Sequence, residues 1–168
     1  LRRERHLEGQ LEPVGEPHVR AEVEHQLPRH HRLSAVGGLP IGVERGWITR
    51  GAAEERAGRV LRTLAENPRN RKHGVLLHFV DLKTGGPHGA WQELQYSTID
   101  HALFLAGALV AAKYLGGDVA AVVDRFVHES NWHWYDVSDR GLITFGWRHA
   151  GDADRDAGDF RPYDWHIA

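Results

Sequence analysis

Residues 91–100 and the apolar segment that follows them most constrain how this chain can fold. Residues 101–115 form the most apolar segment of the sequence. Apolar residues recur at helical spacing through this region: Ile99, Leu103, Ala106 and Val110. Ser97 precedes Asp100 by three residues, which is the spacing of a capping box at the start of a helix. The sequence therefore predicts a buried helix that begins just after Ser97.

The same stretch brings two carboxylates and two aromatic rings to the start of that helix. Glu93 and Asp100 are the acids, and Trp91 and Tyr96 are the rings. Glycoside hydrolysis needs such a pair of carboxyl groups, one to donate a proton and one to activate water or attack. The alternative interpretation is that Asp100 only caps the helix and that Glu93 is a solvated loop acid.

Composition limits the classes of function. The chain has 168 residues, of which 41% are hydrophobic and 26% charged, as expected for one globular domain. A net charge of −2 gives no electrostatic reason to expect binding to nucleic acid or to an anionic membrane. No uncharged apolar run reaches 18 residues, so no membrane span is expected. The chain contains no methionine, which favours a fragment.

No cofactor or metal is expected. The sequence has no cysteine, no phosphate-binding loop and no dinucleotide fingerprint. Asp152, Asp154 and Asp156 alternate as in a calcium loop, but the glycine comes one place late and Tyr163 stands where the bidentate acid belongs. These three acids are therefore interpreted as a solvated loop, and the compartment and oligomeric state stay open.

Residues 1–33 differ from the rest of the chain. They hold six Arg, six Glu and five of the 13 His, and apolar residues occur singly between prolines. Such a segment buries too little apolar surface to offset the entropy lost on ordering. We predict that residues 1–33 are disordered or non-native and that the folded domain comprises residues 34–168.

Further elements follow from periodicity and caps. Thr49 is expected to cap an amphipathic helix over residues 50–66, and Asn67-Pro68 to end it. Residues 75–80 read as a strand or extended segment ending at Asp81. Asp118 is expected to cap a helix over residues 119–129. Its predicted core face consists of Val119, Val122, Val123 and Phe126.

The densest aromatic patch lies at residues 131–136. Trp132, Trp134 and Tyr135 cannot all be buried on one helical face, so some of these rings are expected to line the surface as platforms for sugar rings. The alternative is ordinary packing at a helix end. Residues 142–147 are predicted to be extended.

Several blocks, in order, resemble the glycoamylase-like family, which includes bacterial endo-β-1,2-glucanases. The blocks are residues 34–37, 40–50, 78–85, 93–100, 103–107, 132–134 and 146–147. This resemblance implies an all-α fold, an incomplete arc of an (α/α)6 toroid with short extended segments. Two departures stand out: residues 1–33 lack the family's lead-in, and the family's usual Pro-Glu does not follow Gly146-Trp147. A partial domain truncated at its C-terminus is the resulting expectation, with one glutamate of the family lying past Ala168.

The resemblance also implies a function and a site. We expect a fragment of a bacterial glycoside hydrolase that acts on β-glucan, β-1,2-linked, with inversion, and that is inactive alone. A periplasmic or secreted location would fit the family. The helix dipole favours an ionised Asp100, which is therefore assigned to substrate orientation or the base side, and Glu93 is assigned to the acid side. The alternative partners are Asp81, Glu44 or a glutamate past Ala168. The expected substrate-binding residues are Glu44, Trp47, Asp81, Trp91, Trp132, Trp134 and Trp147. The alternatives are a non-hydrolytic carbohydrate-binding module or the inactive product of a broken reading frame.

Overall fold

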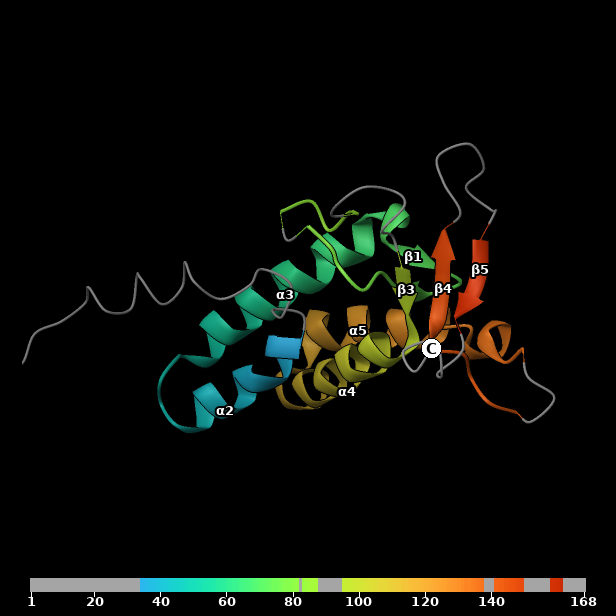
Figure 1. The fold of residues 1–168 in the computed structure, drawn as a ribbon. Helices are drawn as coiled ribbons and strands as arrows, with labels where there is room; N and C mark the ends of the chain where they lie inside the picture. Colours follow the sequence, from blue (N-terminus) through green and yellow to red (C-terminus); the bar gives the residue numbers. More distant parts are fainter. Residues whose placement is uncertain (1–33, 82, 88–94, 138–140, 150–157, 162–168) are drawn as a thin grey trace, which may run out of the picture.

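The computed structural model describes residues 34–81, 83–87, 95–137, 141–149 and 158–161. Helices dominate these residues, and two small sheets lie at one end of the helical part (Figure 1). The long helices are α3 (Arg50–Glu66), α4 (Thr98–Leu115) and α5 (Gly117–Glu129). Two short helices, η1 (Ser34–Gly38) and α2 (Leu39–Glu44), precede them. The predicted leader at residues 1–33 lies outside the described part.

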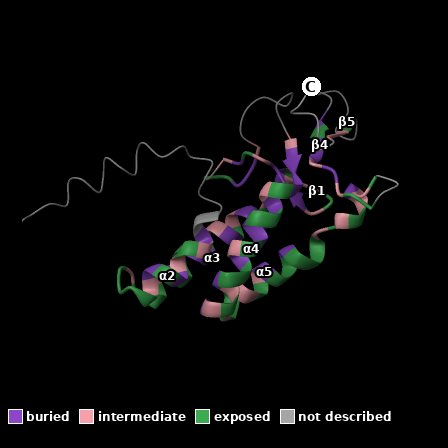
Figure 2. Ribbon diagram, turned by 60° about the horizontal axis from the view of Figure 1, so that its bottom comes forward, coloured by how far each residue is buried: buried purple, intermediate pink, exposed green. Residues whose placement is uncertain are grey.

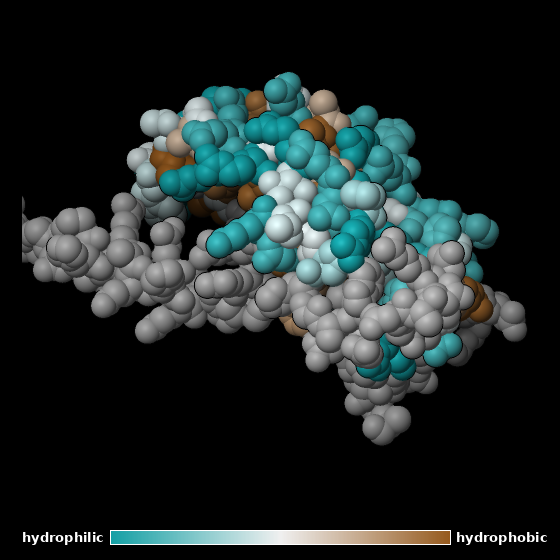
Figure 3. Space-filling model, turned by 90° about the horizontal axis from the view of Figure 1, so that it is seen from above, coloured by the Kyte–Doolittle hydropathy of each residue, from teal (hydrophilic) through white to brown (hydrophobic). Residues whose placement is uncertain are grey.

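Helix α3 has the bounds that the sequence predicts. Thr49 is its N-cap, and the Thr49 hydroxyl oxygen accepts a hydrogen bond from the backbone N–H of Ala52 at 3.2 Å. Ala53, Ala57, Leu61 and Leu64 form its buried face. Its outer face is rich in arginine and glutamate, in keeping with the mostly hydrophilic surface of Figure 3.

Replacing Thr49 with alanine is expected to lower the free energy of unfolding by about 1 kcal/mol, because the Ala52 N–H loses its acceptor. Urea unfolding measures this change, and Thr49→Ser is the control that keeps the hydroxyl. Equal stability of the alanine variant and the original chain would show that the cap does not stabilise α3.

Helix α4 begins and ends where predicted but buries a different face. Ile99, Leu103, Ala106 and Val110 are exposed, Leu103 by 60%. The buried face consists of Thr98, His101, Phe104, Leu105, Ala108, Ala111 and Leu115. Because the helix is apolar all round, helical spacing fits both faces, so periodicity alone could not identify the core side. The prediction of which face is buried was wrong.

Glycine separates α4 from α5. Gly116 has a φ of +73°, a conformation that a side chain would strain, and it is both the C-cap of α4 and the N-cap of α5. Asp118 lies within the first turn and does not cap α5, which corrects the prediction. Val119, Val123 and Phe126 are buried and Val122 is partly buried, as expected for its core face.

Two small sheets accompany the mostly helical fold, which the sequence predicts as all-α with short extended segments. Strands β1 (Arg71–Lys72) and β2 (Val75–Leu76) form an antiparallel pair. Strands β3 (Gln95–Ser97), β4 (Gly146–His149) and β5 (Gly158–Arg161) form an antiparallel sheet in that order. The predicted strand at residues 75–80 is shorter and continues only as isolated bridges, Leu77 with Tyr96 and Val80 with Pro87. Extended segments far apart in sequence find partners only through the tertiary fold.

The core lies between α3, α4 and α5 and continues beneath the sheets (Figure 2). Phe104 of α4 meets Phe126 of α5 edge to face, with ring centroids 5.3 Å apart. Tyr135, in the short 3-10 helix η4 (Trp132–Tyr135), is fully buried, and its hydroxyl donates to the Lys72 carbonyl at 2.8 Å. This bond links the end of the helical part to β1.

Helix α4 is long and apolar enough to cross a membrane, judged by length and composition only. The core helix of a soluble protein meets the same test. By itself, one such helix is weak evidence for a membrane span.

Candidate functional site

Asp100 lies in the first turn of α4, where three polar side chains meet. Its Oδ2 is 2.7 Å from His78 Nδ1, and the Ser97 hydroxyl donates to the same oxygen. The side chains of His78 and Asp100 are 40% and 41% exposed, so the pair is accessible from outside. A carboxylate, an imidazole and a hydroxyl therefore form one cluster at the start of α4.

The backbone explains this meeting. Strand β3 ends at Ser97 and passes directly into α4, so Ser97 is both the last strand residue and the helix N-cap. Its hydroxyl oxygen accepts from the Asp100 N–H at 3.3 Å. The segment around His78 runs beside β3, and the His78 N–H donates to the Gln95 carbonyl at 2.7 Å. This places His78 over the helix start.

The cluster keeps Asp100 ionised. Partial burial alone would raise the pKa of this carboxyl, but hydrogen bonds from His78 and Ser97 and the charge of His78 outweigh it and lower the pKa below its usual value. The positive end of the α4 dipole acts in the same direction. Asp100 is therefore a hydrogen-bond acceptor and a poor proton donor.

Of the other predicted site residues near Asp100 in sequence, only Asp81 lies within the described part of the chain. Glu93 and Trp91 lie outside the described residues. Asp81 organises a tight turn, since its Oδ1 accepts from the N–H of Lys83 and Thr84 at 3.0 and 2.9 Å. This contact gives Asp81 a structural role whether or not it binds a sugar.

Glu44 is the last residue of α2, and the Trp47 N–H donates to the Gly42 carbonyl of the same helix at 2.8 Å, whereas Asp100 lies at the start of α4. Glu44 accepts a hydrogen bond at 2.5 Å from Tyr114, in the last turn of α4. At 1.5 Å per residue, Tyr114 is roughly 20 Å along the helix from Asp100. Paired glycosidase carboxyls stand roughly 5–9.5 Å apart. Glu44 is therefore excluded as the catalytic partner of Asp100. Trp47, which is 67% exposed, stays a predicted sugar-binding residue.

The three later tryptophans are engaged in packing. Trp147 is only 3% exposed and lies in the middle strand of its sheet, with the Lys72 ammonium 4.7 Å from the ring centroid. Trp134 stacks on His73 with centroids 4.2 Å apart, and Trp132 is half-buried beside His101. Their role in sugar binding stays a prediction, and Trp147 is too buried to offer an open ring face.

Comparisons with known proteins bear on the fold. No family model and no curated protein match the sequence. The chain is similar in structure to a crystal structure of a Bacteroides uniformis ATCC 8492 protein provisionally named a glucoamylase. The TM-score is 0.60 and the identity 21%, over 68% of this chain and 29% of that one. The fold is glucoamylase-like. The match spans less than a third of that neighbour's length.

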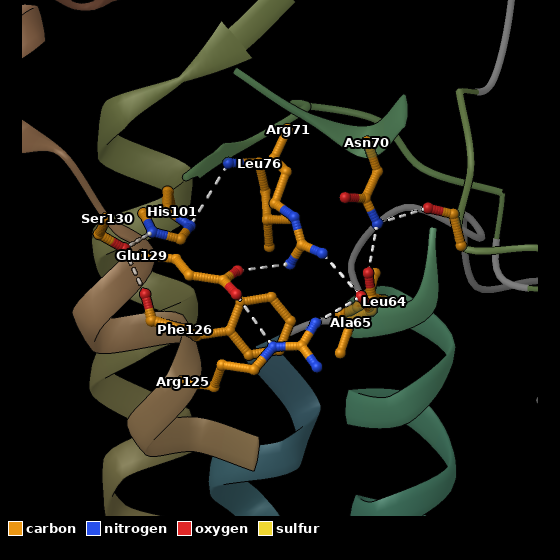
Figure 4. A network of polar contacts seen from close by, with 11 residues as sticks. Leu64, Ala65, Asn70, Arg71, Leu76, His101, Arg125, Phe126, Glu129 and Ser130 are labelled. Carbon is orange, nitrogen blue, oxygen red and sulfur yellow. Dashed lines mark hydrogen bonds and ion pairs between the residues drawn. The ribbon is translucent and has the colours of Figure 1, made fainter. Parts of the chain in front are cut away.

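Sequence reasoning missed a second polar cluster, inside the glucoamylase-like core (Figure 4). His101 is 1% exposed, its Nδ1 accepts from the Leu76 N–H at 3.4 Å, and its Nε2 lies 2.8 Å from the Ser130 hydroxyl. The Ser130 hydroxyl in turn donates to the Phe126 carbonyl. Each polar group in this series of hydrogen bonds has a partner, so the series is interpreted as a structural link between β2, α4 and α5.

Two arginines and a glutamate beside this cluster bind the C-terminal end of α3. Arg71 and Arg125 both donate to the Ala65 carbonyl, at 2.6 and 2.8 Å, and both contact the carboxylate of Glu129. Cations at a helix C-terminus stabilise its free carbonyls. Within the described ranges no group of three His, Cys, Asp or Glu side chains could hold a metal ion.

The signal that could have identified His78 is its neighbourhood. It is a polar residue within the apolar run at residues 75–80, so its side chain had to leave the core or find a partner. Which partner it meets depends on the contact between that segment and β3, which no local pattern encodes.

Proposed function

We propose that this protein is a glycoside hydrolase that acts on a β-glucan, β-1,2-linked, with inversion. The observation that carries the proposal is an accessible, ionised carboxylate, Asp100, held by His78 and Ser97 in a glucoamylase-like fold. In this proposal the substrate is an oligo- or polysaccharide and no cofactor takes part.

We further propose that residues 34–168 form an arc of an (α/α)6 toroid. The exposed apolar face of α4 supports this arrangement, since Leu103, Leu109 and Val110 are each at least half exposed. A hollow of about 540 Å³ between α4 and α5 adjoins this face. A complete toroid would cover such a surface with further helices, and apolar patches of this kind are rarely left open.

The roles follow from the state of each acid. Asp100, kept ionised, would accept a hydrogen bond from the attacking water, which is the base side of an inverting mechanism. Alternatively, it would accept from a sugar hydroxyl and orient the substrate. The acid side requires a second carboxyl that stays protonated, and Glu93 remains the proposed donor. Inversion requires roughly 6.5–9.5 Å between the two carboxyl groups, so that a water fits between them.

Replacing Asp100 with asparagine is expected to lower kcat by about 10² or more, because the amide cannot take a proton from water. Release of reducing ends from β-1,2-glucan measures kcat, and NMR of the first product anomer measures inversion. The protein for this assay is the full-length product of the gene that encodes this chain.

Asp118→Asn is the matched control, because Asp118 also lies in the first turn of a helix but is solvent-exposed. It should leave kcat unchanged. An Asp100→Asn protein that keeps its kcat and loses only about 1 kcal/mol of stability would show that Asp100 only stabilises the start of α4 beside its cap, Ser97.

A second candidate is a sugar-binding module without hydrolysis. The exposed indole of Trp47 favours it, since an open ring face can stack on a sugar. Binding of a β-1,2-glucan oligosaccharide that Trp47→Ala weakens, with no reducing ends released under any condition, would support this candidate over the hydrolase.

A further inference from the structure

We propose that His78 is a positioning residue for Asp100, whose Oδ2 it holds through its Nδ1–H donor so that Oδ1 stays available as an acceptor. The inference rests on the role proposed above for Asp100. It assigns a task to a histidine that lies outside the predicted site.

The contact fixes the tautomer of His78. Asp100 is ionised and can only accept, so the proton in the 2.7 Å contact belongs to His78 Nδ1. In the neutral ring Nε2 then carries the lone pair. Both donors to Asp100, the His78 ring and the Ser97 hydroxyl, reach the same oxygen, Oδ2. Oδ1 is thereby left to accept from a water or a sugar hydroxyl.

The ring of His78 is itself held in place. Its backbone N–H bonds to the Gln95 carbonyl, and the preceding residue, Leu77, forms a bridge with Tyr96. The Phe79 ring lies 3.9 Å from the imidazole, centroid to centroid. A donor that is anchored to β3 can orient a carboxylate more narrowly than a mobile surface side chain can.

No second ionisable group competes for this task within the described residues. His78 is the one titratable side chain there whose charge acts on the Asp100 carboxyl. The imidazole of His101, the next residue along the helix, points into the core toward Ser130 and Leu76 (Figure 4). Two side chains therefore hold Asp100, the Ser97 hydroxyl and the His78 ring, and His78 is the ionisable one of the two.

The test is a carbon-13 NMR titration of the Asp100 carboxyl in the whole chain, without any sugar. His78→Asn keeps an N–H donor near the position of Nδ1, whereas His78→Phe keeps the ring bulk and removes the donor. We expect the titration midpoint of Asp100 to rise further in His78→Phe, which loses both the donor and the charge of His78, than in His78→Asn, which keeps a donor. His128→Phe is the control, because His128 pairs only with the exposed Asp124, 3.5 Å away.

A second measurement covers the case in which a variant does not fold. Nitrogen-15 NMR of His78 in the original chain should show the Nδ1–H tautomer, and Asp100→Leu, which has no acceptor, should abolish that preference. An Nε2–H tautomer in the original chain would overturn the proposal. So would an unchanged Asp100 midpoint in a folded His78→Phe protein, or an equal rise in both His78 variants. Because no sugar is present, these results do not depend on whether the protein cleaves a glucan.

Discussion

At pH 4 this protein is expected to be about 3 kcal/mol less stable to unfolding than at pH 7 through one residue, His101. Burial, with a smaller contribution from the positive charge of Arg71, lowers the pKa of His101 from 6.5 to about 4. Between pH 6.5 and pH 4 the unfolded chain takes up a proton at His101, whereas the folded protein does not. The stabilising contribution is therefore complete above pH 6.5 and is lost as the pH falls toward 4.

Urea unfolding at intervals from pH 7 to pH 4 measures this effect. The His101→Gln variant should lose about 3 kcal/mol less than the original chain over that range, because it has no proton to take up. His133→Gln is the control, since that ring is exposed. Equal pH dependence of His101→Gln and the original chain would contradict the prediction. If the variant does not fold, ring NMR of His101 should show no protonation between pH 7 and pH 5.

Phe126→Ala should have an effect at least as large, lowering the free energy of unfolding by about 3–5 kcal/mol. Phe126 is 1% exposed and packs edge to face against Phe104. The guanidinium carbon of Arg71 lies 5.4 Å from the centroid of the Phe126 ring. Its removal leaves a cavity where α4 and α5 pack and deprives the buried guanidinium of its ring.

The midpoint and slope of urea unfolding give the stability of this variant. Val127→Ala, at the next position, is the control, because Val127 is 38% exposed and should change stability by no more than about 0.5 kcal/mol. A loss below about 1 kcal/mol for Phe126→Ala would mean that the helices repack around the gap.

The sequence predicted the long helices better than it predicted their faces. Thr49 and Ser97 are caps and Gly116 ends a helix for local reasons, so the bounds of α3 and α4 could be read directly. The buried side of α4 could not be read, because apolar residues surround the helix and only its neighbours decide which side is covered. Likewise, the pairing of β3 with β4 joins residues that no local pattern connects.

The candidate site shows the same division. Asp100 was identified from its spacing to Ser97, and the structure gives it polar partners at the start of α4. His78 was not identified, because the contact depends on a segment crossing from another part of the chain. Glu44, grouped with Asp100 through the family resemblance, contacts the last turn of α4, and Trp47 contacts Gly42 of α2. Their roles in sugar binding stay predictions.

Ser97 combines three tasks at one buried position. It ends strand β3, it caps α4, and its hydroxyl donates to Asp100. A substitution there would disturb sheet, helix and carboxylate together, so its effect could not be attributed to any one of them. Only threonine offers the same hydroxyl on a side chain that suits both a strand end and a helix cap. Very few residue types can therefore replace Ser97. Substitutions that alter function in this region are expected mainly at His78 and at residues farther along the chain.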